Sequence, residues 1–389
     1  MMYWFFFTVV VFCLFFNTEI PLSFGFEGFV KIFSTVPIVI YFAARMVTKK
    51  IHYSKDAIYV VLLAVAIIIF KWTFEQDYTI RMITLLIIPM LISMSFEKLN
   101  GKELNSLRLI MIIFFLAECG LAIVEWTLNR NFFLTATDTI DYWISFGFFR
   151  SSSLLGHPLG NGQVVAVLMT FIAVCDFKRK YTQILLLILG YVSLYCFNAR
   201  GATIVVTLFT VPYFIWKMNS VTQRNKKWII NASVFCMVLG MFFVVTQTKL
   251  GGRLMNTDIM DSSGQTRLDV FSFYKHYNSS EEFLWGAPEL RERIAEELGT
   301  TDIENGTIAM ILSYGIIFTI LMLFLLFRFQ YNKLSVFSKI EKWLLLAVFF
   351  IIGNMNPNIM VSVQWVIWVL SYYAFRPVLT PPQTVKSKP

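Results

Sequence analysis

The chain has 389 residues, of which 57% are hydrophobic and only 15% are charged, and 40 of them are phenylalanines. Soluble domains carry about 25% charged residues, so this composition excludes an ordinary soluble fold and predicts an all-α, polytopic membrane protein. The formal net charge of +9 comes largely from short basic loops between apolar runs, so no nucleic-acid partner is expected.

A bilayer core about 30 Å thick needs about 20 mainly apolar residues per helix. Twelve runs of this kind occur along the chain, at 1–17, 28–44, 57–73, 79–96, 107–128, 162–175, 183–198, 201–216, 228–246, 305–327, 343–353 and 359–375. The run 343–353 is short, and the polar residues after it also allow one irregular hairpin with the last run. We therefore expect a single integral membrane domain over 1–389, with about twelve transmembrane helices embedded in the lipid bilayer.

The first run carries no basic start and no Ala-x-Ala cleavage pattern, which indicates a retained helix rather than a signal peptide. All five cysteines lie inside or at the edge of apolar runs: Cys13, Cys119, Cys175, Cys196 and Cys236. This placement is typical of small core residues and favours neither disulfides nor metal ligands.

Basic residues are concentrated in alternate loops, which hold 21 of the 33 basic residues and only 5 of the 24 acidic ones. The positive-inside rule places these loops and both termini in the cytoplasm, so 376–389 is expected to be a cytoplasmic tail. The opposite loops then face outward. Two of them are long enough to form structure, the outer loop 129–161 and the large outer loop 247–304.

The large outer loop carries two helix signals. Ser263 begins a sequence typical of a helix start, and Pro288 opens a second helix whose apolar residues Leu290 and Ile294 share one face. Two short amphipathic helices in this place would lie on the membrane surface or form a lid over a cavity. A loop that packs on itself explains the pattern equally well.

Several arginines face outward, against the positive-inside bias: Arg130, Arg150, Arg200, Arg253, Arg267, Arg291 and Arg293. Arg200 lies in the short connection between two spans. An arginine near the membrane centre costs about 2.5–3.5 kcal/mol and therefore usually faces a partner or a watery cavity. The guanidinium group also matches phosphate oxygens. A cap on the preceding helix, or a contact with lipid headgroups, is the alternative explanation for Arg200.

The segment 146–163 reads FGFFRSSSLLGHPLGNGQ and places Arg150, serines and glycines before a span. Small residues let backbone amides approach a ligand, and a glycine-rich helix start directs free N–H groups at an anion. His157 and Asn161 lie in this segment. A turn before a helix explains it more simply, and the three histidines of the chain show no zinc-like spacing, so no metal or cofactor is expected.

Acidic residues also stand near expected spans. Glu304 and Asn305 close the large outer loop, and a partly desolvated carboxylate near arginines is a candidate general base. A helix N-terminal acid that complements the dipole explains Glu304 at least as well. Glu118 and Glu125 lie seven residues apart on one face of a span; inward polar contacts are their simplest explanation, and a proton pathway is the alternative.

The order of these pieces resembles the O-antigen ligase and polymerase superfamily, which includes the Wzy-type polysaccharide polymerases. The similarity covers roughly 146–326, through Arg150 with 156–161, the turn 198–202, the element 263–267, the piece 284–287, the pair 304–305 and the pattern 313–317. Ligases of this superfamily carry a histidine where this chain has Glu304, so the resemblance favours a polymerase over a ligase.

The resemblance implies a metal-independent glycosyltransferase at the outer face of a bacterial plasma membrane, which builds an O-antigen, capsule or exopolysaccharide. Its donor would be an undecaprenyl-diphosphate-linked oligosaccharide, and a chain-length regulator and a flippase would be its partners. Because no cation neutralises the leaving diphosphate, arginines must do so.

The resemblance thereby implies catalytic roles for Arg200 and Arg267, with Glu304 as the base. The expected substrate-binding residues are Arg150, Arg253, His157, Asn161 and Asn305. The alternatives are a ligase-like glycan transferase, a flippase or transporter of lipid-linked glycans, and a non-catalytic membrane anchor. A transporter should show paired repeats with broken helices near the midplane, and the sequence shows no clear halves.

Overall fold

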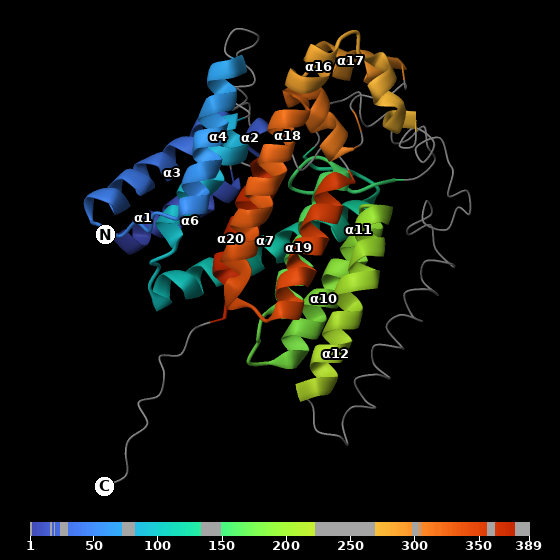
Figure 1. The fold of residues 1–389 in the computed structure, drawn as a ribbon. Coiled ribbons are helices and arrows are strands. Elements are labelled where there is room, and N and C mark those ends of the chain that lie inside the picture. Colours follow the sequence, from blue (N-terminus) through green and yellow to red (C-terminus); the bar gives the residue numbers. More distant parts are fainter. Residues whose placement is uncertain are drawn as a thin grey trace.

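The structure is a computed structural model and describes residues 2–15, 18, 20–23, 30–71, 82–133, 149–221, 269–297, 303, 305–355 and 362–377. Within these ranges the regular elements are helical, and no strand occurs among them. The predicted all-α class is confirmed for this part of the chain (Figure 1).

Helices coincide with each expected span except 228–246, which lies outside the described residues. The helices of the described chain are, inside and outside these spans, α1 (Met2–Phe15), α2 (Ile20–Ser23), α3 (Val30–Val47), α4 (Lys55–Lys71), the π-helical η1 (Ile83–Ile87), α6 (Ile88–Phe96), α7 (Gly101–Leu128), α9 (Pro158–Val174), α10 (Lys180–Cys196), α11 (Arg200–Val205), the π-helical η2 (Val206–Thr210), α12 (Val211–Val221), the 3-10 helix η4 (Val270–His276), α16 (Ser280–Trp285), α17 (Pro288–Glu297), α18 (Gly306–Lys333), the 3-10 helix η5 (Leu334–Val336), α19 (Lys339–Asn354) and α20 (Ser362–Phe375).

Among the described residues, three helical stretches are long and apolar enough to cross a membrane: Gly101–Leu128, Arg200–Ser220 and Gly306–Val336. Shorter apolar helices accompany them, among them Pro158–Val174 and Lys180–Cys196. The described chain is therefore compatible with a membrane protein. The number of twelve spans stays a prediction.

The helices begin where side chains satisfy their free amides. At the start of α7, the Oδ1 atom of Asn100 accepts from the Glu103 amide at 3.0 Å, and the Glu103 carboxylate accepts from the Asn100 amide at 2.8 Å. Ser338 and Glu341 form the same reciprocal arrangement at the start of α19. Such capping boxes fix the helix boundaries in the polar loops, outside the apolar runs.

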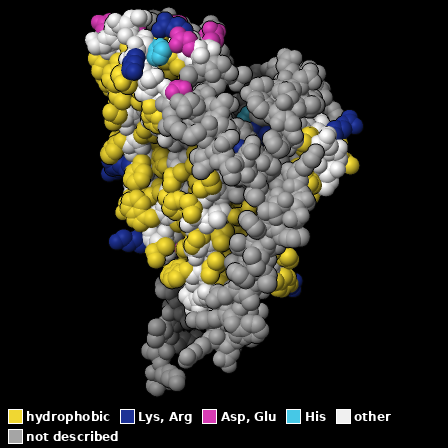
Figure 2. All heavy atoms as spheres, turned by 90° about the vertical axis from the view of Figure 1, so that its right-hand side faces the viewer, with side chains coloured by type: hydrophobic (Ala, Val, Ile, Leu, Met, Phe, Trp, Pro, Cys, Tyr) yellow, Lys and Arg dark blue, Asp and Glu magenta, His cyan; other side chains and the backbone are white. Residues whose placement is uncertain are grey.

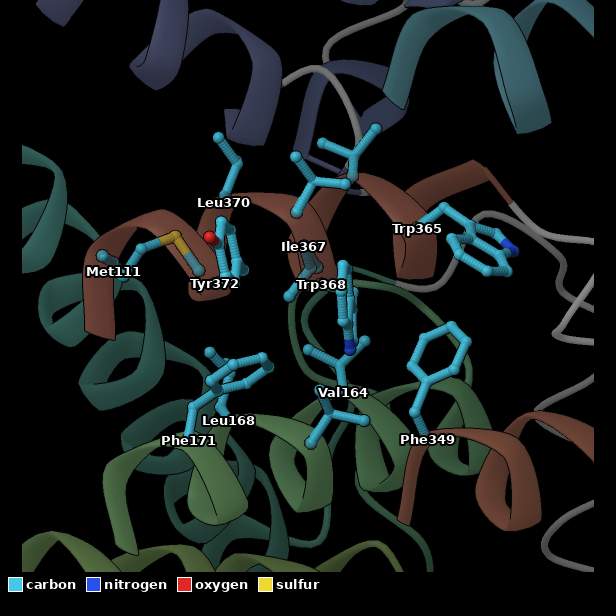
Figure 3. Packing of buried hydrophobic residues seen from close by; sticks show 14 of the residues in the cluster. Met111, Val164, Leu168, Phe171, Phe349, Trp365, Ile367, Trp368, Leu370 and Tyr372 are labelled. Carbon is cyan, nitrogen blue, oxygen red and sulfur yellow. The ribbon is translucent and has the colours of Figure 1, made fainter. Parts of the chain in front are cut away.

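Helix α20 lies in the middle of the bundle and packs against α6, α7 and α9. Figure 3 shows Trp368 of α20 among side chains of α9, and Phe349 of α19 facing Trp365. The Phe349 and Trp365 ring centroids are 4.8 Å apart, and Trp365 and Trp368 are fully buried. A helix that is apolar on every side is suited to such a place, and interlocking rings hold it there by packing.

The basic loops of the described chain meet at one end of the bundle. The Arg45 guanidinium donates to the Lys98 carbonyl at 2.9 Å, and Lys333 and Arg376 both form ion pairs with Glu97. These contacts join the last turns of α3, α6, α18 and α20. The alternation of basic loops along the sequence predicts that these loops lie at one end of the bundle. The remaining loops then lie at the opposite end.

At that opposite end, η4, α16 and α17 cover the first turns of α18 (Figure 1). The helix expected from Pro288 is confirmed, and its apolar residues Leu290 and Ile294 are buried in a cluster with Ile308 and Leu312 of α18. The start expected at Ser263 lies outside the described residues. Figure 2 shows acidic, basic and histidine side chains gathered at this end and hydrophobic side chains over the band below it. Residues 269–297, which belong to the expected large outer loop, are therefore folded onto α18, a helix long and apolar enough to cross a membrane.

Helix α18 is broken at Gly315, whose backbone has φ +80°. The backbone around Gly286 fills the break, and the Ala287 amide donates to the Leu312 carbonyl at 2.8 Å. A Cβ atom on Gly315 would lie 2.2 Å from the Leu284 carbonyl oxygen. Only glycine combines the positive φ with this approach of two backbones, so the two glycines interlock the segment 284–287 and α18.

Candidate functional site

The segment that carries Arg150 is anchored on α7 by Glu125. The Oε2 atom of this fully buried carboxyl accepts from the amides of Ser152 and Ser153, both at 2.8 Å, and its Oε1 atom accepts from the Phe132 amide at 2.9 Å. The Ser153 hydroxyl adds a bond to the Glu118 carbonyl at 2.8 Å. These bonds satisfy backbone groups that would otherwise be buried without partners, so α7 sets the path of the loop.

Arg150 is itself held at the end of α10. It is only 3% exposed, and its Nε atom donates to the Phe197 carbonyl at 3.0 Å. The Ser151 amide donates to the Cys196 carbonyl at 3.1 Å. The carbonyl end of a helix favours a cation, so this contact keeps the guanidinium in place before any ligand arrives.

His157 and Asn161 shape the loop that follows. Asn161 is fully buried, accepts from the Leu155 amide at 3.2 Å and donates to the Ser152 carbonyl. The Nδ1 atom of His157 accepts from the Gly160 amide at 3.4 Å, and α9 begins one residue later, inside the expected loop 129–161. Both side chains therefore have a structural role, and their contact with a substrate stays a prediction.

The charge state of His157 follows from its surroundings. His157 is exposed as a residue, but desolvation by nearby protein atoms, and then the positive charge of Arg150, lower the pKa of its imidazole to about 4. The imidazole is therefore neutral at pH 7, as its role as acceptor for the Gly160 amide requires. The interaction also places His157 and Arg150 close together.

Arg200 begins α11, directly after the turn that receives Arg150. The turn is made by Asn198, which has φ +53°, a conformation that asparagine tolerates better than most residues. The first turn of α9 packs on it: a Cβ atom on Gly162 would lie 2.5 Å from the Ala199 Cβ atom. Arg200 is half-buried, so the structure brings it to the same end of the bundle as Arg150 and His157.

Asn305 is connected to the segment around Arg200 by contacts at the end of α19. A Cβ atom on Gly201 would lie 2.5 Å from the Met355 sulfur, so the start of α11 contacts the end of α19. Next to Met355, the Asn354 Oδ1 atom accepts from the Thr307 amide at 2.9 Å. Asn305 caps the same first turn of α18 by accepting from the Ile308 amide at 3.0 Å. A chain of contacts thus leads from Arg150 to Asn305 through the segment 197–201, which holds Arg200.

The other predicted site residues are Arg253, Arg267 and Glu304, and all three lie outside the described residues. Two further arginines that are expected to face outward make other contacts. Arg291 donates to the Ser313 hydroxyl at 3.2 Å and ties α17 to α18. Arg130 is exposed beside the ring of Phe132.

One buried cation was missed by sequence reasoning. Lys71, the last residue of α4, is only 3% exposed, and its Nζ atom donates to the Gly286 carbonyl at 3.5 Å. It also interacts electrostatically with Glu289. The signal was present, since a lysine at the outward end of an expected span runs against the positive-inside bias as the outward arginines do.

Among the described residues, no group of three or more His, Cys, Asp or Glu side chains is placed to hold a metal ion. The cationic groups described at this end, Arg150, Arg200 and Lys71, suit an anionic ligand. In comparisons with protein-family models, curated proteins and solved structures, none matches the chain.

Proposed function

We propose that the protein is a membrane glycosyltransferase that polymerises undecaprenyl-diphosphate-linked oligosaccharide repeat units into a surface polysaccharide at the outer face of a bacterial plasma membrane. The observation that carries the proposal is the position of Arg150 and Arg200 on one chain of contacts at the end of the bundle opposite the basic loops. A lipid-linked diphosphate spans the same boundary, with its lipid in the bilayer and its charge at the surface.

Arg150 and Arg200 have different roles in this proposal. Arg150 is buried and fixed by the Phe197 carbonyl, so its positive charge is held in a preorganised position. Arg200 is more exposed at the start of α11 and contacts the diphosphate as it arrives. Charge-assisted bonds from guanidinium groups stabilise the negative charge that builds up on the leaving diphosphate.

In the proposed reaction one proton moves from the acceptor hydroxyl to the base, and a new glycosidic bond replaces the bond between the donor sugar and the diphosphate. Glu304, which directly precedes the placed Asn305, takes the proton from an acceptor sugar hydroxyl. The hydroxyl oxygen attacks the anomeric carbon of the donor sugar, and the bond from that carbon to the diphosphate oxygen breaks. Undecaprenyl diphosphate leaves with the electron pair, held by Arg200 and Arg267, while Arg253 contacts the same ligand. A chain-length regulator and a flippase would act beside the enzyme.

Purified protein in nanodiscs and lipid-linked repeat units should yield a ladder of products. Arg150→Ala and Arg200→Ala should each lower the rate by a factor of about 100 or more, as loss of a transition-state donor does. Arg130→Ala is the matched control, because Arg130 is exposed and its side chain lies beside the ring of Phe132. If both site variants give the same product ladder as the unmodified protein, neither arginine takes part in the reaction.

A transporter of lipid-linked glycans remains the alternative, because α18 is a broken helix and transporters use such helices. The break at Gly315, however, lies in the outer third of Gly306–Val336 and is filled by the backbone around Gly286. A substrate site needs that space to be open. A ligase-like transferase would instead move the glycan onto a different acceptor, and the size of the product distinguishes it from a polymerase.

A further inference from the structure

The outer loop carries a hollow built from residues that the arginine site does not use. It is lined by Tyr274, Tyr277, Asn278, Ser279, Ser280 and Phe283, and its volume is about 420 Å³. This volume lies within the range of about 300–1,000 Å³ of small-molecule sites, and the hollow is shallow and widely open to solvent. Its lining combines three aromatic rings with amide and hydroxyl groups.

The walls of the hollow are fixed by the contact between η4 and α16. The rings of Tyr277 and Phe283 meet edge to face with centroids 5.3 Å apart. The Ser279 hydroxyl accepts from the Glu282 amide at 3.2 Å, and the Glu282 carboxylate accepts from the Asn278 amide at 2.9 Å. These bonds hold the turn between the two helices, while Tyr274 is 61% exposed and its ring lies beside Phe273 and Lys275.

We infer that this hollow binds a sugar unit of an uncharged glycan. A pyranose carries C–H groups on its faces and hydroxyls around its rim, so its faces pack on aromatic rings and its rim exchanges hydrogen bonds with polar groups. The tyrosines and Phe283 supply the rings, and Asn278 with the two serines supplies donors and acceptors. The combination of flat rings and adaptable short polar side chains fits this ligand class.

The surrounding charge argues against an anionic ligand. The described loop residues 269–297 contain seven acidic and only three basic residues. Their field repels a diphosphate or an anionic lipid headgroup. The assignment of the bound sugar to the growing polysaccharide rests on the proposed function: the arginines hold the diphosphate end, and the hollow holds sugar units further from it.

The test uses the full chain in nanodiscs and the repeat-unit oligosaccharide, free of lipid and phosphate, released from the surface polysaccharide of the organism that encodes the protein. Binding is measured by saturation-transfer NMR and titration. Tyr274→Ala should weaken binding about tenfold, which corresponds to about 1.4 kcal/mol, while Tyr274→Phe keeps the ring and most of the affinity. Phe271→Ala is the matched control, because Phe271 is 57% exposed on the same helix η4 and does not line the hollow.

Two results would overturn the inference: no binding of the oligosaccharide to the unmodified protein, or equal losses in Tyr274→Ala and Phe271→Ala, which would indicate aromatic contacts with the membrane interface. The assay needs no glycosyl transfer, so the two proposals separate. Binding through Tyr274 without polymer formation supports the hollow and refutes the polymerase. If polymer forms but Tyr274→Ala binds the oligosaccharide as the unmodified protein does, the polymerase proposal is supported and the sugar-binding hollow is refuted.

Discussion

Replacing Glu125 with leucine should release the loop that carries Arg150. The change removes the acceptor of two buried amides, those of Ser152 and Ser153, and of the Phe132 amide. A buried donor left without a partner costs about 1–3 kcal/mol, so the two buried amides alone predict a loss of about 2–6 kcal/mol. Glu125→Gln should cost less, because its one carbonyl oxygen can keep the two serine amides while only the Phe132 amide loses its acceptor.

Hydrogen exchange in peptides that cover 149–157 measures this loss directly, because a local destabilisation of about 2.8 kcal/mol raises the exchange of opened amides about 100-fold. Transfer activity should fall with it, through the misplaced Arg150. Glu281→Gln serves as the control, since Glu281 is an exposed carboxylate of the outer loop. If exchange over 149–157 is the same in Glu125→Leu and in the unmodified protein, the carboxyl does not hold the loop.

Three further predictions concern other parts of the molecule. Gly315→Ala should destabilise the outer end of α18 by several kcal/mol, since the new methyl group would overlap a carbonyl oxygen at 2.2 Å; thermal unfolding should show no such loss for Gly120→Ala, whose Cβ meets nothing within 4 Å. Burial raises the pKa of Glu97, but the charges and hydrogen bonds of Lys333, Tyr373 and Arg376 outweigh it and hold the pKa below its ordinary value. The pairing therefore stabilises the protein above the ordinary pKa of glutamate and is lost as pH falls through the lowered one, so unfolding of Glu97→Gln should depend less on acid. Between pH 5 and 8 activity should not follow a histidine titration, because the pKa of His157 is lowered to about 4, and His157→Asn, which keeps a helix cap, should stay active.

The sequence predicted the helices well because membrane spans are set by a local property, about 20 apolar residues in a row. It did not predict the break in α18. The run 305–327 is apolar throughout and therefore indicates one continuous helix. The cause of the break, Gly286, lies 29 residues before Gly315, and the approach of their two backbones has no local signal.

Some residues of the candidate site could be predicted from a local sequence pattern, and others could not. Outward arginines could be found in the sequence because they violate a charge rule, and Lys71 could have been found by the same test. The structural roles of Glu125 and Asn161 could not be predicted from the sequence. Each side chain accepts from backbone amides that only the folded chain brings close to it. A carboxyl on one face of a span indicates an inward polar contact, but it does not show which loop the carboxyl holds.

The contact between Gly286 and Gly315 orders the biogenesis of the protein. Residues around Gly286 are synthesised before α18, yet their backbone partner at the Leu312 carbonyl belongs to that helix. The contact can therefore form only after the first turns of α18 have been synthesised and folded. It is thus a late step, and a mutation at either glycine should leave a chain whose helices have formed while 284–287 is not yet packed on α18.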